Sequence, residues 1–239
     1  MRCGVRVPVV VEAMKRALDL FCCDGGAAMG LFDAGFDEIV GIDIEPHPNY
    51  PFDFIQADAT NPPVDLSEFH FIWASPPCQM FTSATKTNAK KHSRRRGIYK
   101  NLIPETRILL EGSGLPFCIE NVPGAPIRKD LLLCGEMFGL RVIRHRIFEV
   151  HGFRAEKLRH PHHKKHSGCY YYSICGDTAP SQERRKRILH NLNQQPTREE
   201  WQGAMCMPWS KSKKNIAEAV PPAYSKYIAS EFFRTGDIK

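Results

Sequence analysis

Long apolar runs are missing from this sequence of 239 residues. A helix that crosses a bilayer needs about 20 consecutive apolar residues, and no stretch of the chain approaches that length. The apolar run at residues 5–11 is too short for a signal peptide and lacks the small residues of a cleavage site. With 42% hydrophobic and 25% charged residues, the composition is that of a soluble globular protein. We therefore expect a cytoplasmic protein without a membrane partner.

Regularly spaced cysteines are also missing. The chain has nine cysteines, an odd number without a repeating interval, so we expect reduced thiols instead of a disulfide framework. Internal repeats and low-complexity tracts are absent as well. A chain of this length can bury a full core, which suits one medium domain with a small second one.

Acidic residues are missing from residues 86–100, where seven basic residues stand. Removing these seven leaves 26 bases against 26 acids, so the whole net charge of +7 comes from this segment. A run of like charge is often only a solvated stretch. Next to a reactive site, it instead indicates a loop that closes over a polyanion such as nucleic acid. The seven residues are Lys86, Lys90, Lys91, Arg94, Arg95, Arg96 and Lys100.

The segment around Cys78 is the first candidate for chemistry. Residues 69–73 are rich in aromatic and β-branched side chains, which is typical of a buried strand, and Pro76 and Pro77 end that strand at a sheet edge. Cys78 therefore lies at a rim, beside the polar Gln79, where it is placed to attack as a thiolate. Taken alone, a cysteine is more often a small core residue. The other motifs decide between the two interpretations.

The amino-terminal part has the pattern of a doubly wound α/β nucleotide-binding fold. A short apolar strand at residues 17–22 leads through a turn with Gly25 and Gly26 into a helix at residues 27–36. In such folds, the backbone amides of the turn and the helix N-terminus meet the ligand. Glycine-rich turns also occur where a chain merely reverses, so this pattern needs support from the strands that follow.

Two acids stand at the ends of the next two strands. The strand at residues 38–44 contains Asp43 near its end, about 20 residues after the turn, where these folds bind ribose hydroxyls. The strand at residues 53–56 is followed by Asp58, which offers a carboxylate to an adenine amino group. Capping of a turn is the alternative role for each carboxylate.

Glu120 and two arginines complete the candidate site. Glu120 follows an expected strand at residues 115–119. Because the fourth and fifth strands are neighbours in this architecture, Glu120 is expected beside Cys78, where a buried glutamate is a candidate proton donor. Arg144 and Arg146 stand two apart in a further strand, so alternation puts both side chains on one face. Taken alone, both arginines would be surface residues.

The α/β pattern stops near residue 150. Residues 151–212 are rich in His, Lys, Arg, Tyr and Pro, and we assign them to a small second domain. Residues 1–150 and 213–239 then form the first domain. Basic and aromatic side chains of this kind are typical of nucleic-acid contacts. A zinc site is the alternative, but the spacing of its candidates fits no standard zinc finger, so we assign no metal site. Those candidates are His162, His166, Cys169 and Cys175.

Together these motifs resemble those of the DNA cytosine-5 methyltransferases, in particular the compact members carried by bacteriophages. Residues 19–26 (Asp-Leu-Phe-Cys-Cys-Asp-Gly-Gly) are similar to the family's cofactor-binding first motif. Residues 75–79 (Ser-Pro-Pro-Cys-Gln) resemble the nucleophile motif, and residues 120–122 (Glu-Asn-Val) the proton-donor motif. Residues 144–146 resemble the paired-arginine motif, and residues 219–222 the last motif, whose helix returns to the cofactor domain.

The resemblance covers nearly the whole chain except residues 151–200, and three positions depart from the family pattern. Cys23 stands where the family has glycine in the first turn, near the methionine end of the cofactor. Val142 stands where a glutamine usually precedes the arginines, and Glu218 replaces an asparagine, which adds negative charge near the cofactor. The residues that carry the chemistry are unchanged.

The resemblance implies an α/β, doubly wound, Rossmann-like S-adenosylmethionine-dependent methyltransferase domain with a small target-recognition domain. It implies methyl transfer to carbon 5 of cytosine in a base flipped out of the duplex. Cys78 would add to carbon 6, and Glu120 would protonate or hydrogen-bond ring nitrogen 3. Arg146 would hold the 2-oxygen, with Arg144 beside it. The implied cofactor-binding residues are Asp19, Phe21, Gly25, Gly26, Asp43, Ile44, Asp58, Ala219 and Val220. The implied nucleic-acid-binding residues are Gln79, Lys90, Lys91, Arg94, Arg95 and Arg96.

The implied partner is double-stranded DNA, bound by a monomer in the cytoplasm of a bacterial host cell. Two other interpretations stay open. A branch of the same family methylates tRNA with the same motifs, and a relative that only binds nucleic acid would keep the fold without the reaction. The motifs fix neither the target sequence nor whether the transferred group is a plain methyl.

Overall fold

One seven-stranded sheet forms the centre of the protein. The computed structural model describes residues 14–82, 100–163, 172, 174 and 196–236, and within them the strand order is β3-β2-β1-β4-β5-β7-β6. The strands are β1 (Arg16–Leu20), β2 (Glu38–Asp43), β3 (Asp53–Gln56), β4 (Phe71–Ala74), β5 (Phe117–Asn121), β6 (Leu131–Leu133) and β7 (Arg146–His151). The sheet has a parallel part made of β3, β2, β1, β4 and β5. Strand β7 is antiparallel to both of its neighbours, β5 and β6. The chain reverses its direction of winding between β1 and β4, and such sheets bind ligands at the carboxyl ends of the strands beside that reversal.

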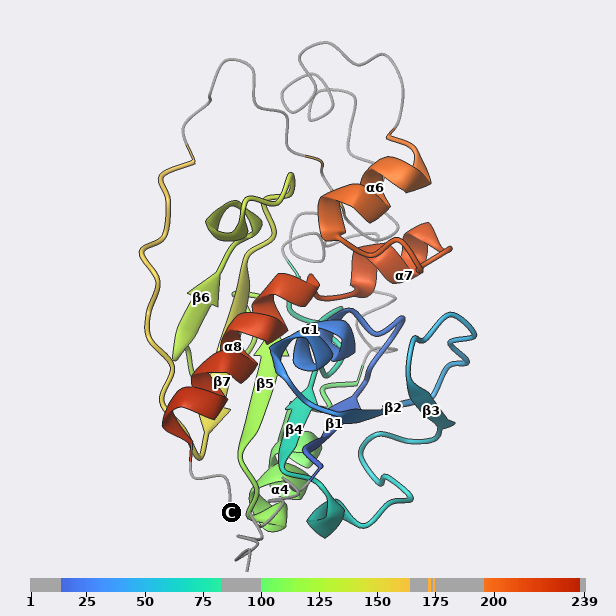
Figure 1. Cartoon of the computed structure of the whole chain (residues 1–239), viewed down its shortest axis with the longest axis vertical. Coiled ribbons are helices and arrows are strands. Elements are labelled where there is room, and N and C mark those ends of the chain that lie inside the picture. Colours follow the sequence, from blue (N-terminus) through green and yellow to red (C-terminus); the bar gives the residue numbers. More distant parts are fainter. Residues whose placement is uncertain (1–13, 83–99, 164–171, 173, 175–195, 237–239) are drawn as a thin grey trace, which may run out of the picture.

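Helices cover both faces of this sheet, as Figure 1 shows. The α-helices are α1 (Gly26–Ala34), α4 (Ile103–Ser113), α6 (Arg198–Met205), α7 (Lys213–Glu218) and α8 (Pro222–Thr235). The 3-10 helices are η1 (Leu66–Glu68) and η2 (Gly135–Phe138). Helices α1 and α8 pack on one face, and α4 packs on the other. Within the described ranges, no helix has the length and apolar character that a membrane span requires.

The central strands are buried on both faces. All residues of β4 and of β5 are buried, because helices leave these strands no exposed side. One core cluster joins α1 and α8 to the sheet through large side chains that include Trp73, Phe148 and Tyr224. Packing of this kind holds the ends of β4 and β5 in fixed positions, which is where the candidate site lies.

Helices α1 and α8 approach so closely that Gly30 has no room for a side chain. A Cβ atom at Gly30 would lie 2.0 Å from the carbonyl oxygen of Pro222 and 2.1 Å from Oγ of Ser225. The same Ser225 hydroxyl donates a hydrogen bond of 2.8 Å to the carbonyl oxygen of Ala27. The carboxyl-terminal helix is therefore fastened to the helix that follows the first turn.

Two expectations about the strands need correction. Glu120 was expected just after the fifth strand, but β5 continues through it to Asn121, because Glu120 pairs with Phe148 of the antiparallel strand β7. Arg144 was expected to alternate with Arg146 along one strand, but β7 begins only at Arg146. The two arginines therefore do not alternate along one strand.

A separate hydrophobic cluster crosses the expected domain boundaries. It contains Val142, which precedes residues 151–212, and Tyr172 and Met205, which lie within them. It also contains Ile216, which follows them. The described part of residues 151–212 thus shares a small core with both neighbouring segments. The division into two domains stays a prediction.

We expect Gly30→Ala to destabilise the fold by about 1–3 kcal/mol, because its Cβ would press on backbone that cannot move freely. Gly112→Ala is the matched control, since a Cβ there meets nothing within 4 Å and alanine favours the interior of α4 by up to about 1 kcal/mol. Urea unfolding of the two variants checks this. Equal free energies of unfolding for both would show that the contact between α1 and α8 is loose.

Candidate active site

The carboxyl ends of β1, β2, β4 and β5 border one cavity of about 240 Å³. Its lining brings together the reactive residues and most of the cofactor-binding residues that the sequence predicts. The predicted residues that line it are Asp19, Phe21, Asp43, Ile44, Asp58, Cys78, Gln79, Glu120, Arg146, Ala219 and Val220. Three predicted residues, Gly25, Gly26 and Arg144, are not part of the lining.

The turn that carries Cys78 is held by hydrogen bonds from both neighbouring strands. The backbone N–H of Ser75 donates to the carbonyl oxygen of Leu20 at the end of β1, at 3.0 Å. The side-chain amide of Asn121, at the end of β5, donates to the carbonyl oxygen of Pro76 at 2.8 Å. Because both partners belong to rigid strands, Cys78 has a fixed position beside the end of β5.

Cys78 is partly buried and carries a protonated thiol at rest. Burial raises the pKa of Cys78, and the positive charge of Arg146 offsets this only in part. A buried thiol that faces a guanidinium gives up its proton more easily than one in an apolar core. The position next to Arg146 thus distinguishes Cys78 from Cys118, which is fully buried in the sheet.

Glu120 and Arg146 form a buried ion pair at the cavity. Nε of Arg146 lies 2.7 Å from Oε1 of Glu120, and Glu120 is only 6% exposed. Burial raises the pKa of Glu120 even though Arg146 and Arg144 oppose that shift. Glu120 therefore keeps a proton at higher pH than an exposed glutamate, which is the property that a general acid needs.

Arg144 points away from the cavity and binds backbone carbonyl groups. Its Nη2 atom donates to the carbonyl oxygens of Ala217 and Ala219 at 2.6 and 2.8 Å, and Nη1 donates to that of Ile174 at 3.3 Å. The hydroxyl of Tyr224 in turn donates to the carbonyl oxygen of Arg144 at 2.6 Å. This geometry makes Arg144 a clamp for the carboxyl end of α7 and the residue that follows it, although its charge still acts on Glu120.

Asp43 and Asp58 cap turns and also line the cavity. Asp43 accepts hydrogen bonds from the backbone N–H groups of Cys23 and Glu45, at 3.1 and 3.0 Å. Oδ1 of Asp58 accepts from the backbone N–H and the hydroxyl of Thr60, at 2.8 and 2.7 Å. The turn-capping role is confirmed for both acids. Their role in binding a cofactor stays a prediction.

The first turn is shaped by its contact with the carboxyl-terminal segment. A Cβ atom at Gly26 would lie 2.1 Å from the carbonyl oxygen of Val220, so this glycine serves the close approach of backbone to backbone. Cys23 has a φ of 48°, in the left-handed region that glycine adopts most easily. That backbone conformation explains why the family pattern has glycine at this position. The Sγ atom of Cys23 lies 3.7 Å from the carbonyl oxygen of Asn215.

Asp24 is a buried hub that sequence reasoning missed. Its carboxylate accepts hydrogen bonds from Asn215 at 2.7 Å, from Ser210 at 2.6 Å and from His47 at 3.0 Å. Its carbonyl oxygen accepts from the indole of Trp209 at 2.7 Å. In the sequence, only the presence of a charged side chain in the first motif pointed to this role of Asp24. The hydrogen-bond partners of Asp24 come from distant parts of the chain.

His47 connects this hub to the end of β2. Nε2 of His47 lies 3.6 Å from Oδ2 of Asp43, while Nδ1 faces Asp24. Burial opposes a charge on the ring, but the hydrogen bonds to Asp24 and Asp43 raise the pKa of His47 to about 9. A charged imidazolium therefore bridges the two carboxylates at neutral pH and fixes Asp43 at the cavity.

Asp19 presents a buried carboxylate to the cavity. Burial and the nearby charge of Asp43 raise the pKa of Asp19 to about 8, although Tyr50 and the N–H of Ala28 oppose that shift. The hydroxyl of Tyr50 lies 3.4 Å from Oδ2. Among the described residues, no donor meets Oδ1 with hydrogen-bonding geometry. A buried carboxylate oxygen without a donor favours a cationic ligand.

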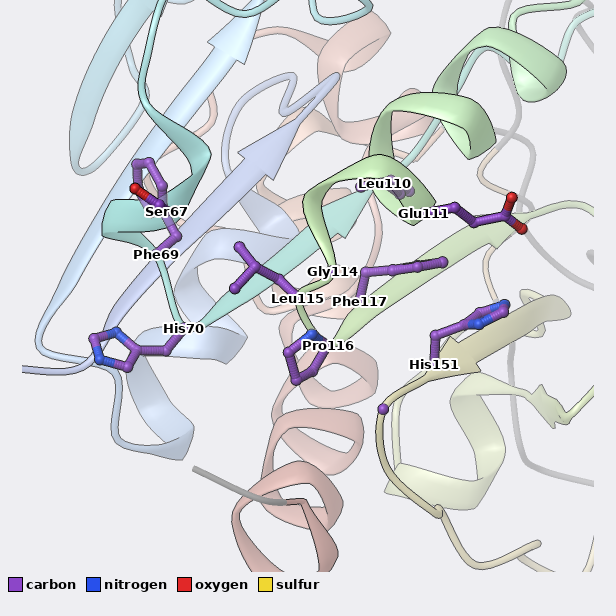
Figure 2. A pocket seen from close by; sticks show the side chains of 11 residues that line it. Ser67, Phe69, His70, Leu110, Glu111, Gly114, Leu115, Pro116, Phe117 and His151 are labelled. Atoms are coloured by element: carbon purple, nitrogen blue, oxygen red, sulfur yellow. The ribbon is translucent and has the colours of Figure 1, made fainter. Parts of the chain in front are cut away.

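The predicted nucleic-acid contacts are only partly described. Gln79 lines the cavity, whereas Lys90, Lys91, Arg94, Arg95 and Arg96 lie outside the described residues. A larger cavity of about 590 Å³ lies at the amino ends of β4 and β5, between His70, Leu115 and His151 (Figure 2). It contains none of the predicted site residues. Parallel sheets bind ligands at their carboxyl ends, so the smaller cavity is the candidate active site.

Comparison with known proteins finds a family match for the amino-terminal part of the chain. Residues 15–130 match the model of the family described as C-5 cytosine-specific DNA methylase. A similar solved structure is that of a candidate DNA modification methyltransferase encoded within an E. coli prophage. It is 20% identical, with a TM-score of 0.39, over 56% of this chain and 45% of that chain. This chain thus matches less than half the length of that protein. No curated protein sequence matches the chain.

The segment that matches the family model contains the first turn, the Cys78 turn and Glu120, which all contribute to the lining of the cavity. Arg146, Ala219 and Val220, which complete the lining, lie beyond that segment. The sheet with helices on both faces is the Rossmann-like arrangement that the sequence predicts. Residues 15–130, just under half of the chain, thus resemble the C-5 cytosine-specific DNA methylase family.

Proposed function

We propose that this protein transfers a methyl group from S-adenosylmethionine to carbon 5 of cytosine in double-stranded DNA. The observation that carries the proposal is the one cavity whose lining holds Cys78 and Glu120 together with the strand-end acids Asp19 and Asp43. Group transfer requires the donor and the acceptor to meet in a single site with a fixed orientation. The family match supports cytosine as the acceptor.

The reaction needs a nucleophile and an acid on the cytosine ring. Carbon 5 is a poor nucleophile, so the Cys78 thiol loses its proton to water and Sγ adds to carbon 6 while Glu120 gives a proton to ring nitrogen 3. The resulting electron density on carbon 5 would take the methyl group as the bond from that methyl to the sulfonium sulfur breaks, with S-adenosylhomocysteine as the leaving group. Water then removes the carbon 5 proton, Cys78 leaves as a thiolate, and nitrogen 3 returns its proton to Glu120. The raised pKa of Glu120 supports its role as the acid.

Arg146 serves both partners of this reaction. Its guanidinium pairs with Glu120 at 2.7 Å and lowers the pKa of Cys78 against the effect of burial. A planar guanidinium with several donors also suits the 2-oxygen of cytosine, which gains negative charge when Cys78 adds. We therefore assign Arg146 to binding the 2-oxygen and stabilising the thiolate.

The residues of the cavity fit S-adenosylmethionine. When bound, this cofactor supplies a methyl group on a cationic sulfonium. Asp19 lines the cavity, and its buried Oδ1 meets no donor among the described residues, which suits a cation. Ile44 is 69% exposed beside the cavity and offers an apolar surface for a base. Asp43 is held by His47 and the first turn, where it would bind ribose hydroxyls.

DNA is the substrate that the charge distribution favours. The net charge of +7 comes from the seven bases in residues 86–100, which directly follow the Cys78 turn. A flipped cytosine costs a few kcal/mol of stacking and pairing, and phosphate contacts supply free energy toward that cost. We assign the segment to closing over the DNA backbone next to the cavity.

Bisulfite sequencing of plasmid DNA from cells that express the protein tests this proposal. The wild type is expected to leave methylated cytosines in a recurring sequence, and Cys78→Ala to leave none. Glu120→Gln keeps the shape of the side chain without the proton and should slow methylation of purified DNA by roughly 10²–10⁴-fold. Transfer of labelled methyl groups to tRNA and not to duplex DNA would reassign the substrate. Binding of S-adenosylmethionine without transfer to either nucleic acid would contradict the reaction.

Binding of S-adenosylmethionine should depend on the ionisation of Asp19. The pKa of Asp19 in the folded protein is about 8, above the ordinary value of 3.8. Between these two pH values, the folded protein keeps a proton that the unfolded chain has lost. The free energy of unfolding therefore falls as the pH rises toward 8. A cationic ligand favours the ionised form. The affinity should therefore rise by up to about tenfold per pH unit from about pH 6 to about pH 7.5.

Isothermal titration calorimetry in two buffers of different ionisation enthalpy measures this affinity and the protons released on binding. Asp19→Asn is the matched control, since it cannot ionise and should bind weakly with no dependence on pH. A wild-type affinity that stays constant over this pH range would remove Asp19 from the cofactor site.

A further inference from the structure

Four metal-ligating side chains meet outside the active site. They come from the end of β6, from the loop before β7 and from the segment after β7, and their ligand atoms all lie within 4.8 Å of one another. The four residues are Cys134, His145, His160 and His163. Cys134 is buried, and the histidines are partly buried or exposed, so the cluster lies at the surface with its sulfur on the inner side.

The three imidazoles present the same ring atom to one point. Nε2 of His145 lies 2.9 Å from Nε2 of His160 and 3.0 Å from Nε2 of His163. One Nε2 atom carries either one hydrogen or one lone pair, so it cannot satisfy two such neighbours by hydrogen bonding. A cation shared by the three lone pairs does satisfy them.

The distances are close to those of a tetrahedral zinc site. With Zn–N bonds of about 2.0 Å and a Zn–S bond of about 2.3 Å, neighbouring nitrogens lie about 3.3 Å apart and a nitrogen lies about 3.6 Å from the sulfur. Sγ of Cys134 lies 3.6 Å from Nε2 of His163. Nε2 of His145 is a few tenths of an ångström closer than that to Nε2 of His160 and to Nε2 of His163.

Groups around the cluster hold its ligands in the required form. A carboxylate oxygen of Glu136 hydrogen-bonds to Nδ1 of His163, which places the ring hydrogen on Nδ1 and leaves the Nε2 lone pair for a metal. The backbone N–H of Met137 donates to the carbonyl oxygen of Cys134 at 3.0 Å, which fixes the backbone of Cys134 at the start of η2.

We propose that Cys134, His145, His160 and His163 bind one zinc ion in a closed, tetrahedral, structural site. One thiolate and three imidazoles form a donor set that suits zinc, and four protein ligands leave no open position for catalysis by the metal. This site would be separate from the active site and does not depend on the proposed reaction.

The site would connect the reactive arginine to the segment that leads toward the expected target-recognition domain. His145 stands between Arg144, which binds the carbonyl groups of Ala217 and Ala219 at the end of α7, and Arg146, which pairs with Glu120. His160 and His163 lie in the segment that follows β7. A metal at this point would fix both segments to the end of β6.

Sequence reasoning pointed to other ligands. Of the expected candidates, His162 is exposed and is not in the cluster, and His166, Cys169 and Cys175 lie outside the described residues. The ligands found here come from both sides of β7, so no short motif with a regular spacing marks them. Only the hairpin of β6 and β7 brings Cys134 to His145.

Metal analysis of the untagged, full-length protein tests the proposal. We expect about one zinc per chain by mass spectrometry after purification without chelators. Cobalt that replaces the zinc should give the visible absorption of a tetrahedral ion and a thiolate charge-transfer band in the near ultraviolet. A wild-type protein that binds neither metal tightly would overturn the proposal.

Four variants assign the ligands. His160→Ala and Cys134→Ser should each lose the bound metal, and Cys134→Ser should lose the charge-transfer band. His162→Ala, an exposed neighbour, should keep both. Glu136→Gln should weaken zinc binding by roughly 10–100-fold, as expected for a group that orients a ligand. Circular dichroism checks folding, because His160 is partly buried and its ring stacks on that of His145. Full metal content in folded His160→Ala protein, or its loss in His162→Ala, would refute the assignment.

Discussion

The active site depends on the buried ion pair between Glu120 and Arg146. Two charges removed from water destabilise a fold unless they meet at close range with further hydrogen bonds. The 2.7 Å contact between Nε of Arg146 and Oε1 of Glu120 supplies the close range, because β7 lies antiparallel to β5 and begins at Arg146. The pairing of these two strands therefore decides where the acid stands, and through the charge of Arg146 it also tunes the thiol of Cys78.

A second constraint is that the carboxyl-terminal segment closes the cavity. Arg144 binds the carbonyl groups of Ala217 and Ala219, and Asp24 binds the side chains of Ser210 and Asn215. These contacts hold Ala219 and its neighbours against the first turn, which is nearly the whole chain length away in sequence. The proposed cofactor site takes residues from the first turn and from the segment around Ala219, so we expect cofactor binding and fold stability to be closely coupled.

Local sequence patterns predicted the parallel strands and the residues at their carboxyl ends, because strand burial and turn residues are local signals. Cys78 and Glu120 were placed side by side on the neighbour rule for parallel strands, and the structure confirms that β4 pairs with β5. The antiparallel return of β7, the clamp at Arg144 and the hub at Asp24 were missed. Each depends on partners far away in the sequence, which no periodicity or motif reveals. Gly26 was expected at the ligand, but the local pattern could not show that Val220 occupies the space beside it.

Covalent trapping of Cys78 by DNA tests the central claim most directly. A duplex whose target cytosine carries fluorine at carbon 5 blocks the last step, since fluorine cannot leave as a proton. After incubation with S-adenosylmethionine, the account predicts a protein–DNA adduct that survives denaturing electrophoresis, and peptide mapping should place the bond on Cys78. The adduct should be absent without the cofactor and in Cys78→Ala. An adduct that forms normally in folded Cys78→Ala protein, or one mapped to another cysteine, would contradict the account.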